Sequence, residues 1–117
     1  MLIYGGANLA YVNLTRANLS CANLAYYLIW NAVIHTDLFQ ANLDEVNLSY
    51  ADLKWANLQN ANLSNANLFQ ANLYKAFLYN ANLQNTALIH VKNFNLKYCN
   101  FKKSNLPLIL VGDSIFL

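Results

Sequence analysis

The chain is poor in the residues that interrupt regular structure and in those that carry charge. Its 117 residues include three glycines, one proline and two cysteines, and only 10% of the residues are charged. Two cysteines cannot build a disulfide framework. The few glycines form no phosphate-binding loop. These absences exclude a disulfide-stapled domain and a phosphate-loop nucleotide-binding protein.

The chain also lacks a long hydrophobic segment, although 57% of its residues are hydrophobic. Apolar runs such as Leu108–Val111 are far too short to cross a bilayer, which takes about 20 residues. No basic-then-apolar signal peptide opens the sequence. We therefore expect a cytoplasmic protein with no membrane contact. At this length we expect a single domain over residues 1–117.

What the chain does have is leucine at every fifth position from Leu38 to Leu88. The residue two places before the leucine is alanine in eight of these eleven repeats, and the residue immediately before is mostly Asn or Asp. An α-helix would rotate successive leucines by about 140°, which scatters them around its axis. A strand would point them alternately to opposite faces, because five is an odd number.

A chain that turns by roughly a right angle every five residues brings all the leucines together. Four repeats then close a square coil, and successive coils stack at strand spacing, about 4.8 Å, through parallel ladders. We expect each leucine and the small residue two places before it to point inward, and the other three positions to face water. Leu38 through Leu88 should therefore be nearly fully buried.

These repeats resemble a known family. Tandem A(N/D)LXX motifs, such as ANLQN-ANL from Ala56 to Leu63, are similar to those of the pentapeptide-repeat family and cover nearly the whole chain. The resemblance implies an all-β fold, a right-handed quadrilateral parallel β-helix, here with five to six coils. It implies a scaffold and no particular activity, because one fold can carry many functions.

The repeats do not keep one continuous register. They form three register blocks, at about residues 4–35, 36–90 and 94–117. The first block is interpreted as uninterrupted repeats that end with centres at Ile29 and Ile34, and Leu38 then follows after a one-residue deletion. A longer step of eight residues precedes the third block. We expect local irregularities near residues 34–37 and 90–95, and degenerate repeats at both ends of the solenoid.

No arrangement of reactive side chains indicates catalysis or metal binding. Asp37 and Asp52 stand in for the repeated Asn, which predicts a structural role, and Asp44 and Glu45 are adjacent outward residues. The two histidines fall on different faces, without a second ligand at metal spacing. A convex rod also offers no natural pocket. We therefore expect no enzyme, no cofactor and no metal site.

Residues about twenty apart should share a side of the rod, which groups the outward residues into candidate surfaces. Large apolar patches often mark contacts, although aromatic residues also favour flat β-surfaces for packing reasons alone. The candidate interaction face comprises Tyr11, Trp30, Tyr50, Phe69 and Ile89. The candidate basic face comprises Arg16, His35, Lys54, Trp55, Tyr74 and Lys75. The candidate segment for self-association comprises Leu106, Leu108, Ile109 and Leu110.

The leading hypothesis is a non-enzymatic interaction scaffold for an unidentified protein partner, with a homodimer through the C-terminal end. The alternative is binding of nucleic acid or another anionic surface through the basic face, although few charges are available for phosphate contacts. Some pentapeptide-repeat proteins bind type II topoisomerases by imitating DNA. That role needs a strongly acidic rod, whereas this chain has seven Lys and Arg against five Asp and Glu. The sequence leaves open whether the chain is complete.

Overall fold

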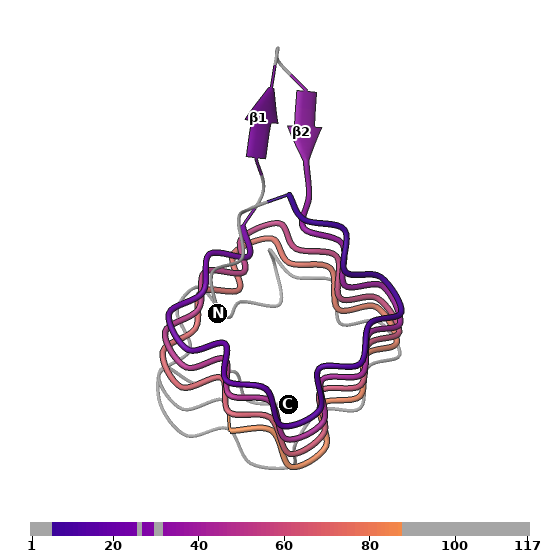
Figure 1. The fold of residues 1–117 in the computed structure, drawn as a ribbon, viewed down its shortest axis with the longest axis vertical. Helices are drawn as coiled ribbons and strands as arrows, with labels where there is room; N and C mark the ends of the chain where they lie inside the picture. Colours follow the sequence, from indigo (N-terminus) through magenta and orange to yellow (C-terminus); the bar gives the residue numbers. More distant parts are fainter. Residues whose placement is uncertain (1–5, 26, 30–31, 88–117) are drawn as a thin grey trace.

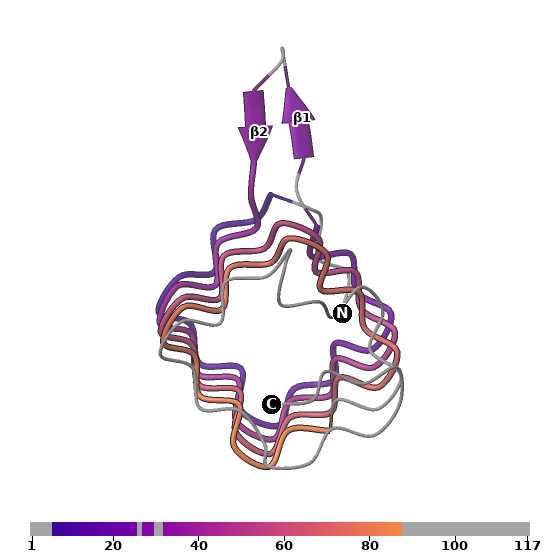
Figure 2. The same ribbon diagram turned by 180° about the vertical axis from the view of Figure 1, so that it is seen from behind.

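In a computed structural model of the protein, the chain winds into a stack of four-sided coils (Figure 1). The structure describes the backbone of residues 6–25, 27–29 and 32–87, and the side chains of residues 6–25 and 35–87. Figure 2 shows the same outline from behind, with each coil following the shape of its neighbour. Equivalent positions of successive coils therefore lie above one another, as the predicted solenoid requires.

From the second coil onward, parallel bridges connect neighbouring coils at intervals of 20 residues. Asp37 pairs with Asn57, and Asn57 pairs with Phe77. Each coil thus contains four five-residue repeats, one on each side of the square. The described residues hold three complete coils and two sides of a fourth. The repeat centres are Leu9, Leu14, Leu19, Leu24, Leu38, Leu43, Leu48, Leu53, Leu58, Leu63, Leu68, Leu73, Leu78 and Leu83.

The leucines fill the axis of the stack. From Leu38 to Leu83 every repeat leucine is 0% exposed, and the small residue two places before it is 0–1% exposed. Two threonines take this inward position in place of alanine, and their hydroxyls donate to backbone carbonyl oxygens at 3.0 and 2.9 Å. The predicted burial is confirmed for the leucines up to Leu83, whereas Leu88 lies outside the described residues.

Asn precedes most of the leucines because its side chain holds the turn that follows. The Oδ1 atom of Asn57 accepts a hydrogen bond from the backbone N–H of Gln59 at 3.2 Å, and other repeats show the same contact. An aspartate offers the same acceptor. The Asp37 Oδ1 atom accepts from the Phe39 N–H at 3.0 Å, and Asp52 does the same for its own turn. The predicted structural role of both aspartates is confirmed.

Each repeat turns its corner through a residue in the left-handed backbone conformation. The residue two places after the leucine has a φ between 53° and 61° at thirteen non-glycine positions of the described chain. Asn tolerates this conformation better than most residues and occupies it at Asn60, Asn65, Asn80 and Asn85. Larger side chains, such as that of Tyr50, adopt it at a local cost of about 1–2 kcal/mol. The local backbone therefore does not explain why bulky residues stand at some of these turns.

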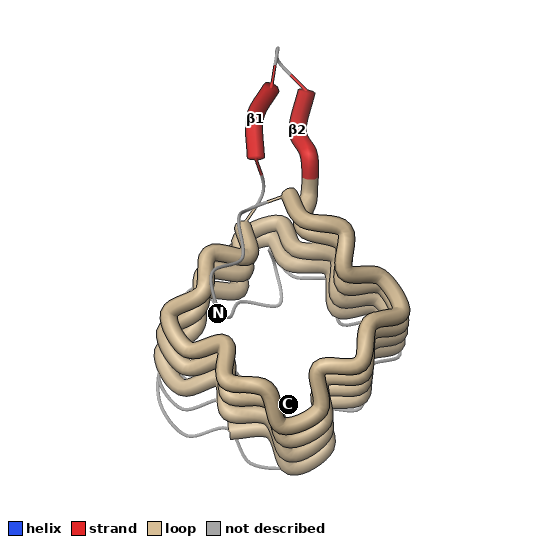
Figure 3. Tube along the Cα trace, viewed as in Figure 1, coloured by secondary structure: helices blue, strands red, loops and turns tan. Residues whose placement is uncertain are grey.

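A β-hairpin interrupts the stack after the first coil. Strands β1 (Tyr27–Ile29) and β2 (Ala32–Ile34) pair in antiparallel fashion and project away from the coils (Figures 1 and 3). The prediction that this segment continues the coils, with repeat centres at Ile29 and Ile34, is wrong. Tyr27 stands two places before Ile29, where a coil corner has room only for a small side chain, so the chain leaves the coil here.

The hairpin is an insertion of nine residues into one corner of the solenoid. Asn8 pairs with Asp37, a separation of 29 residues, which is nine more than the 20 that separate paired residues in the later coils. Removal of residues 26–34 would leave a spacing of five between Leu24 and Leu38, the spacing of every other repeat. The first coil therefore ends with Leu24, and the second begins with Leu38.

The base of the hairpin is closed by Thr36, whose side chain is buried. Its Oγ1 atom donates to the Ala25 carbonyl oxygen at 3.0 Å and accepts from the Gly6 N–H at 2.8 Å. The irregularity expected near residues 34–37 is thus the end of a hairpin and not a one-residue deletion. The irregularity expected near residues 90–95 lies outside the described residues.

The third register block and any coils beyond residue 87 also lie outside the described part of the chain. Within that part, no helix is long and apolar enough to cross a membrane. Figure 3 shows the coils as turns and loops, with β1 and β2 as the strands of the described segments. The coil sides themselves are joined by isolated bridges, one per repeat. The resulting stack places equivalent side chains in vertical columns.

Candidate interaction surfaces

The described residues offer surfaces and no metal centre. No three His, Cys, Asp or Glu side chains in these ranges come close enough together to hold a metal ion. Every buried side-chain nitrogen or oxygen among them has a hydrogen-bond partner. The outward side chains form surfaces according to the side of the stack that they share.

The hairpin insertion places Tyr11 on a different side from the one predicted. The Tyr11 N–H donates to the Phe39 carbonyl oxygen at 2.8 Å, and the two rings meet edge to face with centroids 5.7 Å apart. The sequence placed Tyr11 in one row with Tyr50 and Phe69. This prediction is wrong, because the insertion shifts the first coil by two sides of the square relative to the later coils. Two further members of the candidate interaction face, Trp30 and Ile89, lie outside the described residues.

Tyr50 and Phe69 do form one aromatic pair. Their ring centroids are 5.5 Å apart with the planes at 81°, and the Tyr50 N–H donates to the Phe69 carbonyl oxygen at 2.8 Å. Tyr50 is 54% exposed and holds a turn position with a φ of 60°. The equivalent position in the first coil is Cys21, which is exposed and donates its N–H to the Ser49 carbonyl oxygen at 2.9 Å. This side therefore presents an aromatic ring at a turn.

Arg16 does not belong to a basic face, because it lies beside two carboxylates. Its Nε lies 3.0 Å from Glu45 Oε2, and its Nη2 lies 3.4 Å from Glu45 Oε1. The hydrogen bond to Glu45 raises the pKa of Arg16. Hydrogen bonds from Asn65 Nδ2 at 3.0 Å and Ser64 Oγ at 2.8 Å lower the pKa of Asp44. This side is a polar patch in which opposite charges are paired.

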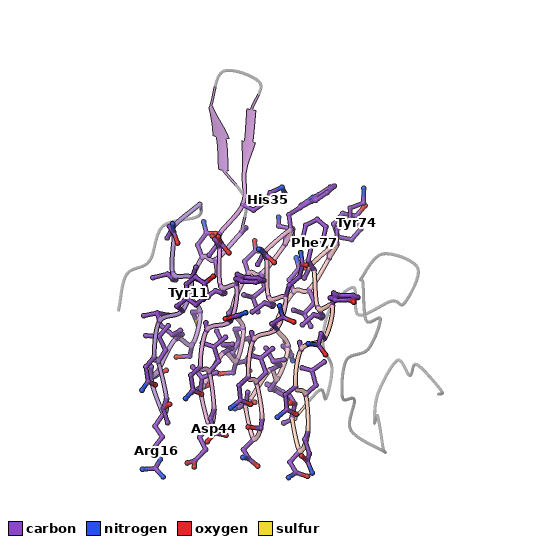
Figure 4. All side chains as sticks on the ribbon, turned by 90° about the vertical axis from the view of Figure 1, so that its right-hand side faces the viewer. Tyr11, Arg16, His35, Asp44, Tyr74 and Phe77 are labelled. Carbon is purple, nitrogen blue, oxygen red and sulfur yellow. The ribbon has the colours of Figure 1, made fainter. Side chains whose placement is uncertain are left out.

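Other members of the predicted basic face come together beside the hairpin. We define the hairpin-side cluster as His35, Trp55, Tyr74, Lys75 and Phe77. Figure 4 shows three labelled members, one histidine and two aromatic residues, on the side of the stack from which the hairpin projects. The same view shows the labelled arginine and aspartate of the polar patch at the opposite side. The hairpin and the cluster therefore face the same direction.

Ring contacts join the members of the cluster. The His35 Nδ1 atom donates to the Trp55 carbonyl oxygen at 2.8 Å, and the His35 ring lies 5.9 Å from Trp55 and 5.6 Å from Phe77 between centroids. The Lys75 Nζ atom lies 4.6 Å from the centre of the Trp55 ring and 5.4 Å from that of Tyr74. These distances are in the range of cation–π interactions. The ammonium group is thus placed over aromatic rings.

Sequence reasoning missed Phe77 and overestimated the positive charge of this side. Phe77 stands where most repeats have Asn, and this departure from the consensus was the signal that could have found it. Lys54, which the sequence assigned to the basic face, forms an ion pair with Asp52 at 3.4 Å. The candidate self-association residues lie outside the described residues: Leu106, Leu108, Ile109 and Leu110.

Comparison with known protein families matches the chain to pentapeptide repeats, in eight copies, at residues 5–26, 34–65, 47–85 and 61–92. The chain belongs to the pentapeptide repeat family. The matched ranges leave out residues 27–33, which fall in the hairpin. The family signature therefore marks the same segment as an interruption of the repeats.

Solved structures of pentapeptide repeat proteins share this fold. One from the Arabidopsis thaliana thylakoid lumen is 25% identical with a TM-score of 0.76, over 96% of this chain and 70% of that one. Rfr23 from the cyanobacterium Cyanothece 51142 is 28% identical with a TM-score of 0.51, over 93% of this chain and 86% of its own. These two neighbours and the family match confirm the predicted right-handed quadrilateral β-helix.

HetL, a pentapeptide repeat protein involved in heterocyst differentiation regulation in the cyanobacterium Nostoc, is 30% identical over 96% of this chain. Its TM-score is 0.46, and this chain spans 54% of its length. A comparison with curated proteins finds no match.

Proposed function

We propose that this pentapeptide repeat protein is a non-enzymatic scaffold that binds a protein partner, with Tyr50 and Phe69 at the centre of the contact. The observation that carries the proposal is an exposed tyrosine ring held at a turn whose backbone favours Asn. Tyrosine is among the residues enriched at the energetic centres of protein interfaces. A large side chain also loses little conformational entropy on binding when its neighbour already restricts it.

The energetics of this turn favour a role for Tyr50 in contact with another molecule and not in the stability of the coil. The left-handed conformation costs a residue such as tyrosine about 1–2 kcal/mol. The edge-to-face contact with Phe69 returns about 0.5–1.5 kcal/mol, so the pair gains little net stability for the coil. Asn60, Asn65, Asn80 and Asn85 hold the equivalent turns without that cost. A bulky residue held in this conformation supports a hypothesis of function.

The alternative, binding of nucleic acid through a basic face, has less support than the sequence indicated. Between residues 6 and 87 the chain has three cations, Arg16, Lys54 and Lys75, and four carboxylates, so this part has no positive excess. Two of the three cations are paired with carboxylates at 3.0 and 3.4 Å. A role as a DNA mimic is no better supported, because the same four carboxylates form no row. A cytoplasmic location and a C-terminal homodimer stay predictions.

Substitution of Tyr50 by Asn tests the proposal without damaging the fold, because Asn suits the turn. The tagged chain would be used to capture partners from an extract of its source cells, and each captured protein would be quantified by mass spectrometry. The matched control is Gln70→Asn, which changes the equivalent turn of the next coil but removes no aromatic ring. A partner lost with Tyr50→Asn and retained with Gln70→Asn supports the proposal. Equal capture by all three proteins contradicts it.

A further inference from the structure

The hairpin is an apolar and uncharged projection. Its two strands have the sequences YLI and AVI, and the register pairs Tyr27 with Ile34, Leu28 with Val33 and Ile29 with Ala32. No Asp, Glu, Lys or Arg occurs between Arg16 and Asp37 in the sequence. Among the described residues, the sheet contains these two strands and no third. A two-stranded ribbon is at best marginally stable in water. We therefore expect the apolar surface of this ribbon to contact another molecule or surface.

The side of the stack around the base of the hairpin also has a distinctive composition. The hairpin-side cluster combines tryptophan, tyrosine, phenylalanine and histidine rings with the Lys75 ammonium group, which lies over two of the rings. Aromatic rings and lysines are the residues that proteins place at the boundary between water and lipid. Figure 4 shows that the hairpin projects from this side, opposite the labelled Asp44. The Asp44–Glu45 carboxylates thus point away from it.

We propose that the hairpin attaches the solenoid to a lipid bilayer surface, with the hairpin-side cluster in contact with the headgroups around its base. This proposal replaces the expectation, drawn from the sequence, of no membrane contact. It also goes beyond the scaffold role, because it uses a different side of the stack from Tyr50. A strand of three residues is about 10 Å long, at about 3.3 Å per residue. Amphipathic elements that lie at a membrane surface reach a depth of about 5–10 Å. The hairpin therefore has the length to enter the headgroup region.

The open edges of the ribbon limit how deeply it enters. Unpaired backbone groups are not tolerated in the hydrocarbon core, where no water can satisfy them. The contact is therefore peripheral and reversible, and it requires no membrane-spanning helix. The aromatic rings and the Lys75 ammonium group around the hairpin base favour a lipid surface over a protein groove, because this composition is typical of the boundary between water and lipid. Anionic lipid attracts a nearby lysine such as Lys75, so phosphatidylserine should strengthen a contact that the apolar hairpin makes.

The test is co-sedimentation of the full chain with vesicles of phosphatidylcholine, alone or mixed with phosphatidylserine. Two variants change the hairpin: deletion of residues 26–34, which restores the five-residue spacing, and Leu28→Asp, which leaves the coils as they are. The control is Tyr50→Asn, which changes another side of the stack. We expect the full chain to bind both vesicle types, and more tightly when phosphatidylserine is present. Both hairpin variants should lose about tenfold or more in partitioning, and Tyr50→Asn should bind as the unmodified chain does.

A second readout uses intrinsic fluorescence, since Trp30 lies between the strands in the sequence and Trp55 is in the cluster. Vesicles should shift the emission of the unmodified chain to shorter wavelength and should leave that of the deletion variant unchanged. The proposal is overturned if the unmodified chain binds neither vesicle type. It is also overturned if Leu28→Asp and the deletion variant bind as well as the unmodified chain. A hairpin-dependent dimer that shows no vesicle binding, detected by light scattering, would assign the hairpin to self-association instead.

Discussion

Deletion of residues 26–34 should leave a complete and stable solenoid. The deletion joins Ala25 to His35, so that Leu24, Ala25, His35, Thr36 and Asp37 form one ordinary five-residue repeat that leads to Leu38. Thr36 already points inward and Asp37 already pairs with Asn8, as the inward and bridging residues of other repeats do. No residue of the leucine core is removed, because every described core residue lies outside the deleted segment.

The expected change in stability is small because two contributions nearly cancel. Shortening the connection from about eleven residues to two reduces the entropy cost of closing it by about 1.5 kcal/mol. His35 would have to adopt the left-handed turn conformation, which costs about 1 kcal/mol or slightly more. The net change is therefore within about 1–2 kcal/mol of zero, which corresponds to a shift in Tm of a few degrees.

Urea denaturation followed by circular dichroism measures this change directly. The deletion variant should unfold in one transition, with a free energy of unfolding close to that of the unmodified chain. A matched control removes nine other residues, 60–68, which takes out two core leucines and shifts the spacing of the coils. That control should fail to fold. If the 26–34 deletion lowers the free energy of unfolding as much as the control does, the hairpin is part of the coil. The interpretation of residues 26–34 as an insertion is then refuted.

Two further predictions concern the core and the polar patch. Leu63→Ala should lower the free energy of unfolding by about 2–5 kcal/mol, because Leu63 is 0% exposed in a closely packed axis; a loss below 1 kcal/mol in a denaturant titration would contradict this. The pKa of Asp44 is lowered in the folded state by Asn65 and Ser64. Its contribution to stability is therefore present above its unfolded pKa and lost as the pH falls through its folded pKa. Asp44→Asn should flatten the acid limb of a pH–stability profile, and an unchanged acid limb would contradict the assignment.

The sequence predicted the coil well because one period determines both its core and its turns. Leucine every fifth residue can be buried only by a square coil, and Asn or Asp before each leucine supplies the acceptor that holds the turn. The positive φ of the residue two places after each leucine was not predicted. Tyr50, Trp55 and Lys75 occupy that position as well as Asn60, so residue type did not reveal the backbone conformation.

The hairpin was missed because Ile29 and Ile34 happen to keep the five-residue spacing. Counting apolar centres alone therefore continued the repeats through an insertion. The informative residue was Tyr27, which is too large for the inward corner that Ala normally fills. The error then moved the first coil by two sides of the square, which placed Tyr11 and Arg16 in the wrong columns. The pairing of Tyr50 with Phe69 was unaffected, because both follow the insertion.

A nine-residue insertion determines which side chains share a surface of this solenoid, and one engineered disulfide tests this placement. Cys21 and Tyr50 hold equivalent turns in adjacent coils, 29 residues apart. Coils stacked at about 4.8 Å bring such positions within reach of a disulfide. With Cys99 replaced by serine, Tyr50→Cys should oxidise readily to an intramolecular disulfide with Cys21, detected by mass spectrometry. Continuous repeats would instead place Cys21 beside Gln40, so a disulfide formed with Gln40→Cys and not with Tyr50→Cys would contradict the account.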